Sequence, residues 1–363
     1  MVDAIVVDDS QFMRVQIRKI LEAGGVTVLG EVHDGTAALE AVTEHQPDVV
    51  TMDVKMPGMD GIEAVERIME REPTPILMLS RYTADGSQTT FDALEAGAVD
   101  FFPKPDSEVS TTLVKYADDL VEKVGVVAQA DVKSVTPTGR TFEPPAESTS
   151  TQSDTGALET PPTVVIAASS GGPPVVQSIL EALPTGLGLR VIVVQHMPDQ
   201  FTRRFAERLD RYCTLDVREA SDGDVLGPDE AVVAAGGSHL VVTGDTGTAL
   251  ELELSEEPPV HSVRPAADVT LESAAEVVSG PLVTVVLTGM GRDGAAGTEA
   301  VKASGGVTLA QQPDTASIAS MPENAISTGA VDEVRPDEEL PAGILDALEE
   351  SLESDNLLSS DPG

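Results

Sequence analysis

Residues 4–9, AIVVDD, form a short β-branched run that ends in two acidic residues. An amphipathic stretch, QFMRVQIRKILEA, follows at residues 11–23, and the same alternation continues to about residue 124. Strands that alternate with helices in this way are typical of βαβ units, in which crossover helices join parallel strands. The pattern predicts five strands and five helices, and therefore a doubly wound parallel sheet over residues 1–124.

The second half of the 363-residue chain follows a change in composition. Pro, Ser, Thr, Gly and Glu dominate residues 125–162, which is typical of a flexible linker. Apolar runs bounded by glycines then predict a second α/β domain, again with a doubly wound sheet, over residues 163–350. Closely spaced runs at residues 231–254 predict an antiparallel insertion in this domain, and residues 351–363 predict an acidic tail.

The charge balance excludes several classes of partner. Lys and Arg number 22 against 62 Asp and Glu, which leaves a net charge of −40. Such a surface repels nucleic acid and anionic lipid, so we expect neither as a partner. Salt near ~1 M shortens the screening length to roughly 3 Å and would relieve the self-repulsion. We therefore hypothesise a halophilic setting.

Hydropathy and cysteine content concern the compartment. No apolar run approaches the ~18 to 20 residues of a membrane helix, and the first ten residues carry acids where a signal peptide carries basic residues. We expect a cytoplasmic monomer without direct membrane insertion. The single cysteine, Cys213, cannot form an internal disulfide, and we interpret it as core filling.

Charged and polar side chains follow several strands of the first predicted sheet. Asp8 and Asp9 follow the first strand, Asp53 ends the third, Ser80 ends the fourth and Lys104 follows the fifth. Any one of these acids alone would be interpreted as a loop or cap residue. Together they should converge, because the carboxyl ends of parallel strands share one edge. Three carboxylates repel one another, so the set predicts Mg²⁺ binding by Asp8, Asp9 and Asp53, with Asp53 able to accept a phosphoryl group.

Two adjacent serines lie at a strand-to-helix turn in the second half. Ser169 and Ser170 follow the predicted strand TVVIAA and precede two glycines. A turn serine is most often a helix cap, but backbone N–H groups at such a turn can also receive an oxyanion. His196 follows the next strong strand and is the histidine best placed to act as general base. Asp293, after the strand LVTVVL, is the acid best placed to orient that imidazole.

The first 124 residues resemble response-regulator receiver domains. The motifs that carry the resemblance are VVDDS, TMDVKMPGMDG, MLS and DFFPKP, in this order. The resemblance implies a flavodoxin-like fold and phosphorylation of Asp53 by a histidine kinase. It also implies Mg²⁺ as the cofactor of phosphorylation and a conformational switch that involves Ser80, Phe101 and Lys104.

Residues 163 to about 335 look like the catalytic domain of the chemotaxis protein-glutamate methylesterase family (CheB). The matching segments are ASSGGPP, VVQHMPDQFTRRFAERL, RPAADV, LTGMGRDGAAG and AQQPDTASIASMPENAISTGAVDEV. The resemblance implies Ser169 as nucleophile, His196 as base and Asp293 as the residue that orients the base. It further implies that the N–H of Met290 helps to bind the oxyanion, and that hydrolysis needs no cofactor.

Three residues depart from the family patterns, and one of them is Arg81, which stands where a small hydroxyl residue is common in receiver domains. Ser170 stands where Thr is usual, which leaves it as the second candidate nucleophile. Val263 stands where His is expected, so the sequence does not predict the supporting polar contact at that position.

The reaction implied by the resemblance is hydrolysis of glutamyl methyl esters on the helices of methyl-accepting chemoreceptors, with deamidation of glutamines at the same site. The unphosphorylated receiver is implied to cover the active site, and phosphorylation to release it. Two alternatives stay open: a receiver-gated esterase for a small-molecule ester, and a catalytically silent adaptor joined to a receiver.

Four arginines fall within nine positions after His196, in a chain that is otherwise acidic. Glu207 has the i, i+4 spacing to pair with Arg203 and Arg211. This spacing leaves Arg204 and Arg208 on an adjacent helix face without partners. We hypothesise that these two arginines bind the acidic receptor helix.

Overall fold

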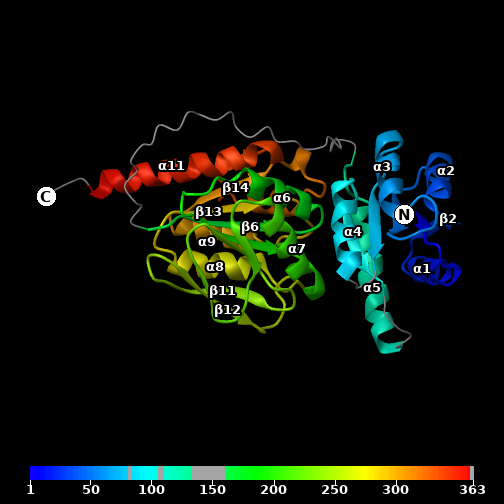
Figure 1. Cartoon of the computed structure of the whole chain (residues 1–363), viewed down its shortest axis with the longest axis horizontal. Helices are drawn as coiled ribbons and strands as arrows, with labels where there is room; N and C mark the ends of the chain where they lie inside the picture. The colour runs from blue at the N-terminus through cyan, green and yellow to red at the C-terminus, as the bar shows by residue number, and fades with distance from the viewer. Residues whose placement is uncertain (81–83, 105–109, 133–159, 360–363) are drawn as a thin grey trace. The chain divides into compact units, whose positions relative to one another are not determined.

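The computed structural model describes residues 1–80, 84–104, 110–132 and 160–359. The chain divides into two compact units, residues 1–139 and 140–363, which run from blue to cyan and from green to red in Figure 1. Both units alternate strands and helices, so the predicted α/β class is confirmed.

The first unit is a five-stranded parallel sheet in the order β2-β1-β3-β4-β5. Its strands are β1 (Asp3–Val7), β2 (Thr27–Val32), β3 (Val49–Asp53), β4 (Ile76–Ser80) and β5 (Asp100–Pro103). Its helices are α1 (Gln11–Ala23), α2 (Gly35–His45), α3 (Gly61–Arg71), α4 (Ala84–Glu95) and α5 (Ser110–Val127). Because β1 lies between β2 and β3, the strand order reverses there, and the carboxyl ends of β1 and β3 form the switch point at which ligands bind in such folds.

Local sequence explains where three of these helices begin. The side chains of Ser10, Asp34 and Asp60 each accept a hydrogen bond from the backbone N–H three residues later. These N-caps satisfy N–H groups that the first helical turn leaves without partners. Each cap lies in the loop after a parallel strand, so the strand-to-helix turns lie at the same edge of the sheet.

Helix α5 continues beyond the predicted domain boundary at residue 124. It ends at Val127, and Val126, Val127, Ala130 and Val132 are all buried. The apolar face of the helix thus extends into the segment predicted as linker, which the shift in composition did not reveal. Residues 133–159 of that segment lie outside the described residues.

The second unit contains two sheets. The larger has seven strands, all parallel, in the order β15-β14-β13-β6-β7-β10-β8, and the smaller has the antiparallel order β11-β12-β9. The strands are β6 (Thr163–Ala168), β7 (Arg190–Gln195), β8 (Asp216–Glu219), β9 (Asp224–Leu226), β10 (Glu230–Val233), β11 (His239–Asp245), β12 (Leu250–Ser255), β13 (Leu282–Val286), β14 (Val307–Gln311) and β15 (Glu333–Arg335). The helices are α6 (Gly172–Ala182), α7 (Asp199–Tyr212), α8 (Ala267–Val277), α9 (Ala295–Ala303), α10 (Ser320–Ser327) and α11 (Leu340–Ser359), with short 3₁₀ turns at Pro313–Thr315 and Asp337–Glu339.

Part of the predicted antiparallel insertion belongs to the parallel sheet. Strand β10 begins the predicted insertion, but it pairs in parallel with β7 and β8. Its residues 231–233 are all buried, as expected of an interior parallel strand. The short spacing between this strand and the next apolar runs wrongly indicated an antiparallel hairpin. The insertion consists instead of β11, β12 and β9, and the short strands β8, β9 and β15 were not predicted.

The predicted acidic tail is largely helical. Helix α11 continues to Ser359, past the boundary predicted at residue 350. The sequence from residue 344 to residue 361 contains neither Gly nor Pro, so nothing in it ends the helix at residue 350. Residues 360–363 lie outside the described residues.

A single apolar cluster joins both sheets of the second unit through α8. It includes Val165 and Ile192 of the parallel sheet, Leu271 of α8, and Leu240 and Leu252 of the smaller sheet. In Figure 1, α8 and α9 lie between β13 and the pair β11 and β12. Burial of this apolar surface therefore holds α8 and the insertion against the face of the main sheet.

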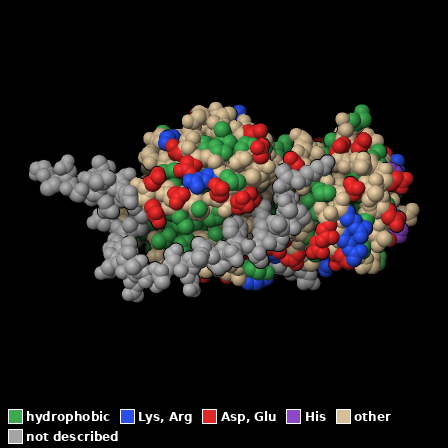
Figure 2. All heavy atoms as spheres, turned by 90° about the horizontal axis from the view of Figure 1, so that it is seen from above, with side chains coloured by type: hydrophobic (Ala, Val, Ile, Leu, Met, Phe, Trp, Pro, Cys, Tyr) green, Lys and Arg blue, Asp and Glu red, His purple; other side chains and the backbone are tan. Residues whose placement is uncertain are grey.

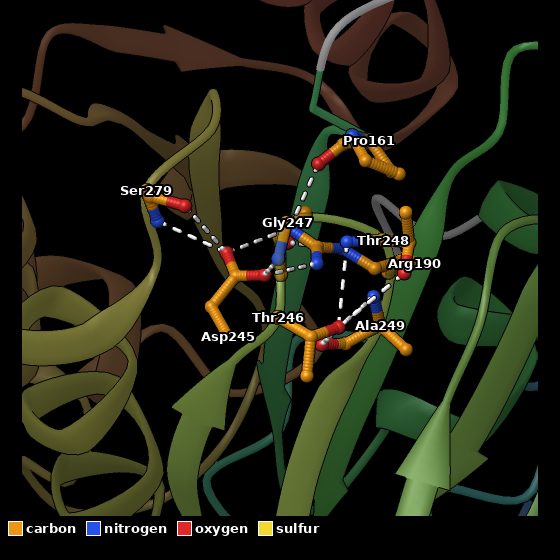
Figure 3. Close-up of polar contacts among 9 residues, drawn as sticks. Pro161, Arg190, Asp245, Thr246, Gly247, Thr248, Ala249 and Ser279 are labelled. Carbon is orange, nitrogen blue, oxygen red and sulfur yellow. Dashed lines mark hydrogen bonds and ion pairs between the residues drawn. The ribbon is translucent and has the colours of Figure 1, made fainter.

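An ion pair fixes the amino-terminal edge of the same sheet. Arg190, the first residue of β7, is fully buried, and its Nη1 lies 2.9 Å from Asp245 Oδ1 at the end of β11. The guanidinium also donates to Thr163 Oγ1 and to the carbonyl of Pro161, while Asp245 accepts from Ser279 and Gly247 (Figure 3). Every polar atom of the pair is thus engaged, so the insertion is fastened to the main sheet far from the strand ends that carry Ser169 and His196.

Acidic side chains are spread over the face of the protein shown in Figure 2, with fewer basic ones among them. This agrees with the net charge of −40. In the part of the chain that the structure describes, no helix is both long enough and apolar enough to cross a membrane.

Candidate functional sites

Three acids of the first unit meet at the carboxyl edge of its sheet. Asp8, Asp9 and Asp53 each offer a carboxylate oxygen, and these oxygens lie within 4.8 Å of one another. Asp8 is fully buried and Asp53 is 9 % exposed, whereas Asp9 is exposed. Crowded carboxylates of this kind are a suitable ligand set for a hard divalent cation.

Lys104 supplies the positive charge that reaches this cluster from the fifth strand. Its Nζ lies 2.5 Å from Asp8 Oδ2 and 2.8 Å from Asp53 Oδ1, and its side chain is 2 % exposed. Arg14 takes part from α1, donating through Nη1 to the carbonyls of Asp8 and Asp9 at 2.7 and 3.2 Å. Sequence reasoning missed Arg14, which holds the acidic loop through its backbone.

The positive charge of Lys104 does not fully offset the effects of burial and of Asp8 on the Asp53 carboxyl. Burial raises the pKa of its carboxyl, the ammonium of Lys104 lowers it, and the nearby Asp8 raises it, with a net increase. A pocket of about 470 Å³ opens beside it, with Asp9, Val54, Met56 and Thr89 among the lining residues. The site therefore combines a buried carboxylate with open space for an incoming group.

Helix α4 contacts Ser80 and Phe101, two of the three predicted switch residues. Thr90 Oγ1 lies 2.7 Å from Ser80 Oγ in a buried hydrogen bond. The next residue, Phe91, packs edge to face on the ring of Phe101, with 6.3 Å between ring centroids. Neither Thr90 nor Phe91 was singled out from the sequence, because helix residues that meet strand ends from another element carry no local signal.

The backbone of the second unit brings Ser169 and His196 to neighbouring strand ends. Ala168 and Gln195 are partners in the parallel pairing of β6 and β7, and the two candidates are the next residues. The N–H of His196 donates to the carbonyl of Ala168, and the N–H of Ser169 donates to that of Thr288. The predicted convergence of the three strand ends is therefore present in the structure.

Asp293 is held in place by three donors. His196 Nε2 lies 2.7 Å from Asp293 Oδ2, and the N–H groups of Ala267 and Asp268 donate to the same carboxylate at 2.6 and 3.0 Å. Burial alone would raise the pKa of Asp293, but these hydrogen bonds and the charge interaction with His196 lower it overall. The carboxylate thus stays ionised beside the imidazole.

The structure pairs the predicted base with its acid, but it does not pair the base with the serine. Among the described residues, no hydrogen bond joins Ser169 Oγ to His196. Nucleophile and base contacts are often long before substrate binds. Ser169 is 6 % exposed and Ser170 is 2 % exposed, so both are buried and exposure does not decide between the two hydroxyls.

The loop at residues 289–291 lies against Ser169. A Cβ added to Gly289 would lie 2.6 Å from Ser169 Cβ, so glycine is required for this close approach. The N–H groups of Gly289 and Gly291 are both engaged, by the carbonyl of Ile318 and by Ser320 Oγ. In the described part of the chain, the N–H of Met290 between them has no hydrogen-bond partner, as an oxyanion donor requires.

The premise that Arg204 and Arg208 lack partners was wrong. Arg204 is not left without a partner, because its Nη1 lies 3.1 Å from Glu207 Oε2. Arg208 is 2 % exposed, donates to Gln177 of α6 and lies over the ring of Tyr212. Helical spacing predicted the pair of Arg203 with Glu207, but it predicted neither the pair of Arg204 with Glu207 nor the packing of Arg208 against α6. Burial removes Arg208 from the hypothesised docking surface, whereas the side chain of Arg204 is 43 % exposed.

Sequence reasoning also missed Asp268 and His261. Asp268 lies within the matching segment RPAADV, and its carboxylate accepts a hydrogen bond from His261 Nε2 at 2.9 Å. His261 thus supplies a polar contact two residues away from Val263, where one was expected. Cys213, predicted as core filling, is only partly buried, and this burial raises the pKa of its thiol to about 12.

Comparisons with known proteins agree with this geometry. Residues 164–344 match the family model of the CheB methylesterase, and residues 4–115 match that of the response regulator receiver domain. A protein-glutamate methylesterase/protein-glutamine glutaminase of Natronomonas pharaonis is 51 % identical over 345 residues, which cover 95 % of this chain and 97 % of the relative. The same-named protein of Halobacterium salinarum is 50 % identical over 353 residues, covering 96 % and 99 %.

A solved structure is similar as well. The CheB methylesterase catalytic domain of Thermotoga maritima is 37 % identical and covers 51 % of this chain and 97 % of its own, with a TM-score of 0.49.

Proposed function

Because the chain belongs to the CheB methylesterase family, we propose how its own residues perform the reaction of that family. The chain is a protein-glutamate methylesterase and protein-glutamine glutaminase of chemotaxis, and its receiver domain places it under control by phosphorylation. A histidine kinase is the phosphodonor and chemoreceptors are the substrate. The observation that carries the mechanism is the hydrogen bond between His196 and Asp293 at the strand ends beside Ser169.

The reaction begins with attack of Ser169 Oγ on the ester carbonyl carbon. Asp293 holds Nε2 of His196, so Nδ1 is the nitrogen that takes the serine proton. The carbonyl oxygen becomes an oxyanion, which the N–H of Met290 stabilises. Asp293 is kept ionised by its lowered pKa and stabilises the imidazolium that forms.

The intermediate then collapses to an acyl-enzyme. His196 gives its proton to the methoxy oxygen, the C–O bond breaks, and methanol leaves. Water attacks the acyl carbonyl with His196 again as base, the bond to Ser169 breaks, and a glutamate carboxylate is released. With a glutamine side chain the leaving group is ammonia, and the remaining steps are the same.

The receiver controls this chemistry through Asp53. The donor set fits a divalent cation, because three carboxylates lie within 4.8 Å and Lys104 balances only one of their charges. Asp8, Asp9 and Asp53 would hold Mg²⁺, which would supply positive charge for the phosphoryl oxygens. Asp53 accepts the phosphoryl group, and we propose that the change reaches Ser80 and Phe101 through their contacts with Thr90 and Phe91 of α4.

The setting of the enzyme is also part of the proposal. We infer a monomer in the cytoplasm, with a requirement for high salt that follows from the net charge of −40. Light scattering in molar and in low salt tests both the oligomeric state and the salt requirement.

Methanol release from a methylated chemoreceptor tests the mechanism, with and without a small-molecule phosphodonor. We expect Ser169→Ala to lose activity by on the order of 10⁴-fold or more, while Ser170→Ala retains it. Asp53→Asn should keep the basal rate and lose the response to phosphodonor. Full activity of Ser169→Ala would transfer the nucleophile to Ser170, and stimulation of Asp53→Asn would remove the proposed control.

A further inference from the structure

Two buried carboxylates lie side by side in the catalytic unit, and the reaction uses one of them. Asp268 and Asp293 are 3 % and 1 % exposed. Asp268 lies in the first turn of α8, and Asp293 immediately precedes Gly294, from which α9 begins. The backbone N–H of Asp268 donates to Asp293 Oδ1 at 3.0 Å, so the two acids are joined directly.

Asp293 binds the N-terminus of α8, the helix that carries Asp268. Asp268 binds the N-terminus of α9, the helix that follows Asp293. Asp293 accepts from the N–H groups of Ala267 and Asp268, which begin α8. Asp268 Oδ1 accepts in return from Gly294 and Gly297, at 2.9 and 2.8 Å, where α9 begins. Helix N-termini favour anions because their first N–H groups have no partner within the helix. This reciprocal arrangement therefore fixes α8, α9 and Asp293 relative to one another.

The second oxygen of Asp268 is held by a histidine. His261 Nε2 lies 2.9 Å from Asp268 Oδ2, and Arg292 Nε donates to His261 Nδ1 at 3.2 Å. A guanidinium can only donate, so His261 Nδ1 must be the acceptor. His261 Nε2 therefore carries the hydrogen and donates it in the hydrogen bond to Asp268. Arg292 thus selects the tautomer in which His261 binds the carboxylate.

These groups do not form a metal site, although His261, Asp268 and Asp293 have ligand atoms within 4.8 Å. Both oxygens of each carboxylate already accept hydrogen bonds, and both ring nitrogens of His261 are engaged. A metal ion would have to replace several of these donors, and the guanidinium of Arg292 would repel it.

We propose that Asp268 is a positioning residue for Asp293, and that His261, oriented by Arg292, keeps the Asp268 carboxylate in place. The proposal rests on the function proposed above, in which Asp293 orients His196. Loss of the charge of Asp268 would weaken its hydrogen bond from the N–H of Gly294, the residue next to Asp293, and an amide nitrogen in place of Oδ2 would face the donor Nε2 of His261. The 2.7 Å contact of Asp293 with His196 would then lose its alignment, and misplacement by about 1 Å can cost about 10²-fold in rate.

The test compares Asp268→Asn, His261→Ala and His261→Gln in the full-length chain, by kcat and KM for methanol release from methylated receptor. We expect Asp268→Asn to lower kcat by about 10- to 100-fold with KM unchanged. His261→Ala should lower kcat by a smaller factor. His261→Gln should recover most of that loss, because its amide can donate to Asp268 as Nε2 does.

Asp245→Asn is the matched control. Asp245 is also a buried acid of the same unit that accepts backbone N–H groups, but it lies at the opposite edge of the sheet with Arg190. It should lower the melting temperature and leave kcat per folded molecule at the parental value. If Asp268→Asn does not fold, the His261 variants carry the test, since that side chain is 24 % exposed.

The double variant with Asp293→Asn decides between positioning and general stability. If Asp268 acts through Asp293, Asp268→Asn should have no further effect on kcat in the Asp293→Asn chain. An equal loss in both backgrounds, or parental kcat in His261→Ala, would overturn the proposal. Parental kcat in Asp293→Asn alone would instead reject the triad itself, so the two failures are distinguishable.

Discussion

The two acidic sites of the chain occupy the same place in their sheets but are neutralised to different degrees. At the receiver site, three carboxylates face one lysine, and burial leaves the pKa of Asp53 raised. At the hydrolase site, Asp293 is more deeply buried in its surroundings, yet its three donors lower its pKa. Burial acts in the same direction on both acids, so the difference arises from the donors that bind Asp293 and from the charge of Asp8 beside Asp53.

This difference corresponds to two kinds of task. A carboxylate that is short of positive charge responds strongly when a cation or a phosphoryl group arrives, which suits a switch. A carboxylate whose hydrogen bonds are already complete needs no rearrangement during the reaction, which suits catalysis. The comparison can be tested by making the same change at both sites.

The largest expected effect is the loss of catalysis in Asp293→Asn. The asparagine keeps the shape but removes the charge that stabilises the imidazolium, and kcat should fall by about 10⁴-fold with or without phosphodonor. The same substitution at Asp53 should leave basal kcat unchanged. Steady-state methanol release measures both, and an Asp293→Asn enzyme within tenfold of the parent would contradict the assigned role.

The buried pair of Arg190 and Asp245 extends the comparison to an acid with no part in the chemistry. Arg190→Leu leaves Asp245 buried without its cation, and should destabilise the catalytic unit by about 3 to 5 kcal/mol. The receiver should unfold as before. Urea unfolding followed by circular dichroism suits a chain without tryptophan. A shift of both unfolding transitions would show that the effect is not confined to the catalytic unit.

Magnesium should stabilise the receiver alone. A ligand that binds only the folded state, and is present at a free concentration of about 100 times its dissociation constant, adds about 2.7 kcal/mol to the free energy of unfolding. The receiver transition should rise accordingly with Mg²⁺, and Asp9→Ala should abolish the rise. Differential scanning calorimetry with Mg²⁺ and with EDTA measures it, and an equal rise in the catalytic transition would indicate a nonspecific salt effect.

The smallest expected effect is a gain of stability in Asp53→Asn without Mg²⁺, of about 1 kcal/mol at neutral pH. Because folding raises the pKa of Asp53, its carboxylate form is disfavoured in the folded state above that pKa. The gain should therefore vanish as the pH falls through the raised pKa. The contribution of Asp293 to stability has the opposite sign, because folding lowers the pKa of its carboxyl. This contribution is present above about pH 4 and is lost as the pH falls through the pKa of Asp293 in the folded state. Melting temperatures of the parent, Asp53→Asn and Asp293→Asn chains across pH 3 to 7 check both signs. A gain in Asp53→Asn that persists at low pH would argue against charge repulsion.

Strand ends were the part of both sites that the sequence could predict. Asp53, Ser169 and His196 each directly follow or end an apolar run, and Asp293 lies in the loop after another such run, so their place at the sheet edge follows from local pattern. The same reasoning predicted both parallel sheets. It misassigned β10 because its spacing to β11 resembles a hairpin, whereas its pairing with β7 and β8 depends on residues far away in the chain.

What the sequence could not predict depends on contacts between elements. The burial of Arg208 requires Gln177 of α6, and the contacts of Ser80 and Phe101 require α4. Asp268 lies only 25 residues before Asp293, but its role depends on two helix N-termini that meet in space. No periodicity or motif within one segment indicates such a meeting.

The loop at residues 289–291 has a further consequence for which substitutions this enzyme can tolerate. The proposed donor at position 290 is a main-chain N–H, while the side chain of Met290 is 44 % exposed at the rim of the site. The proposed catalytic group of Met290 is thus in the main chain, whereas the group exposed to other proteins is its side chain. Substitutions at this position can alter which protein surfaces fit the rim and leave the hydrolytic step unchanged, whereas the neighbouring Gly289 has no room for any other residue.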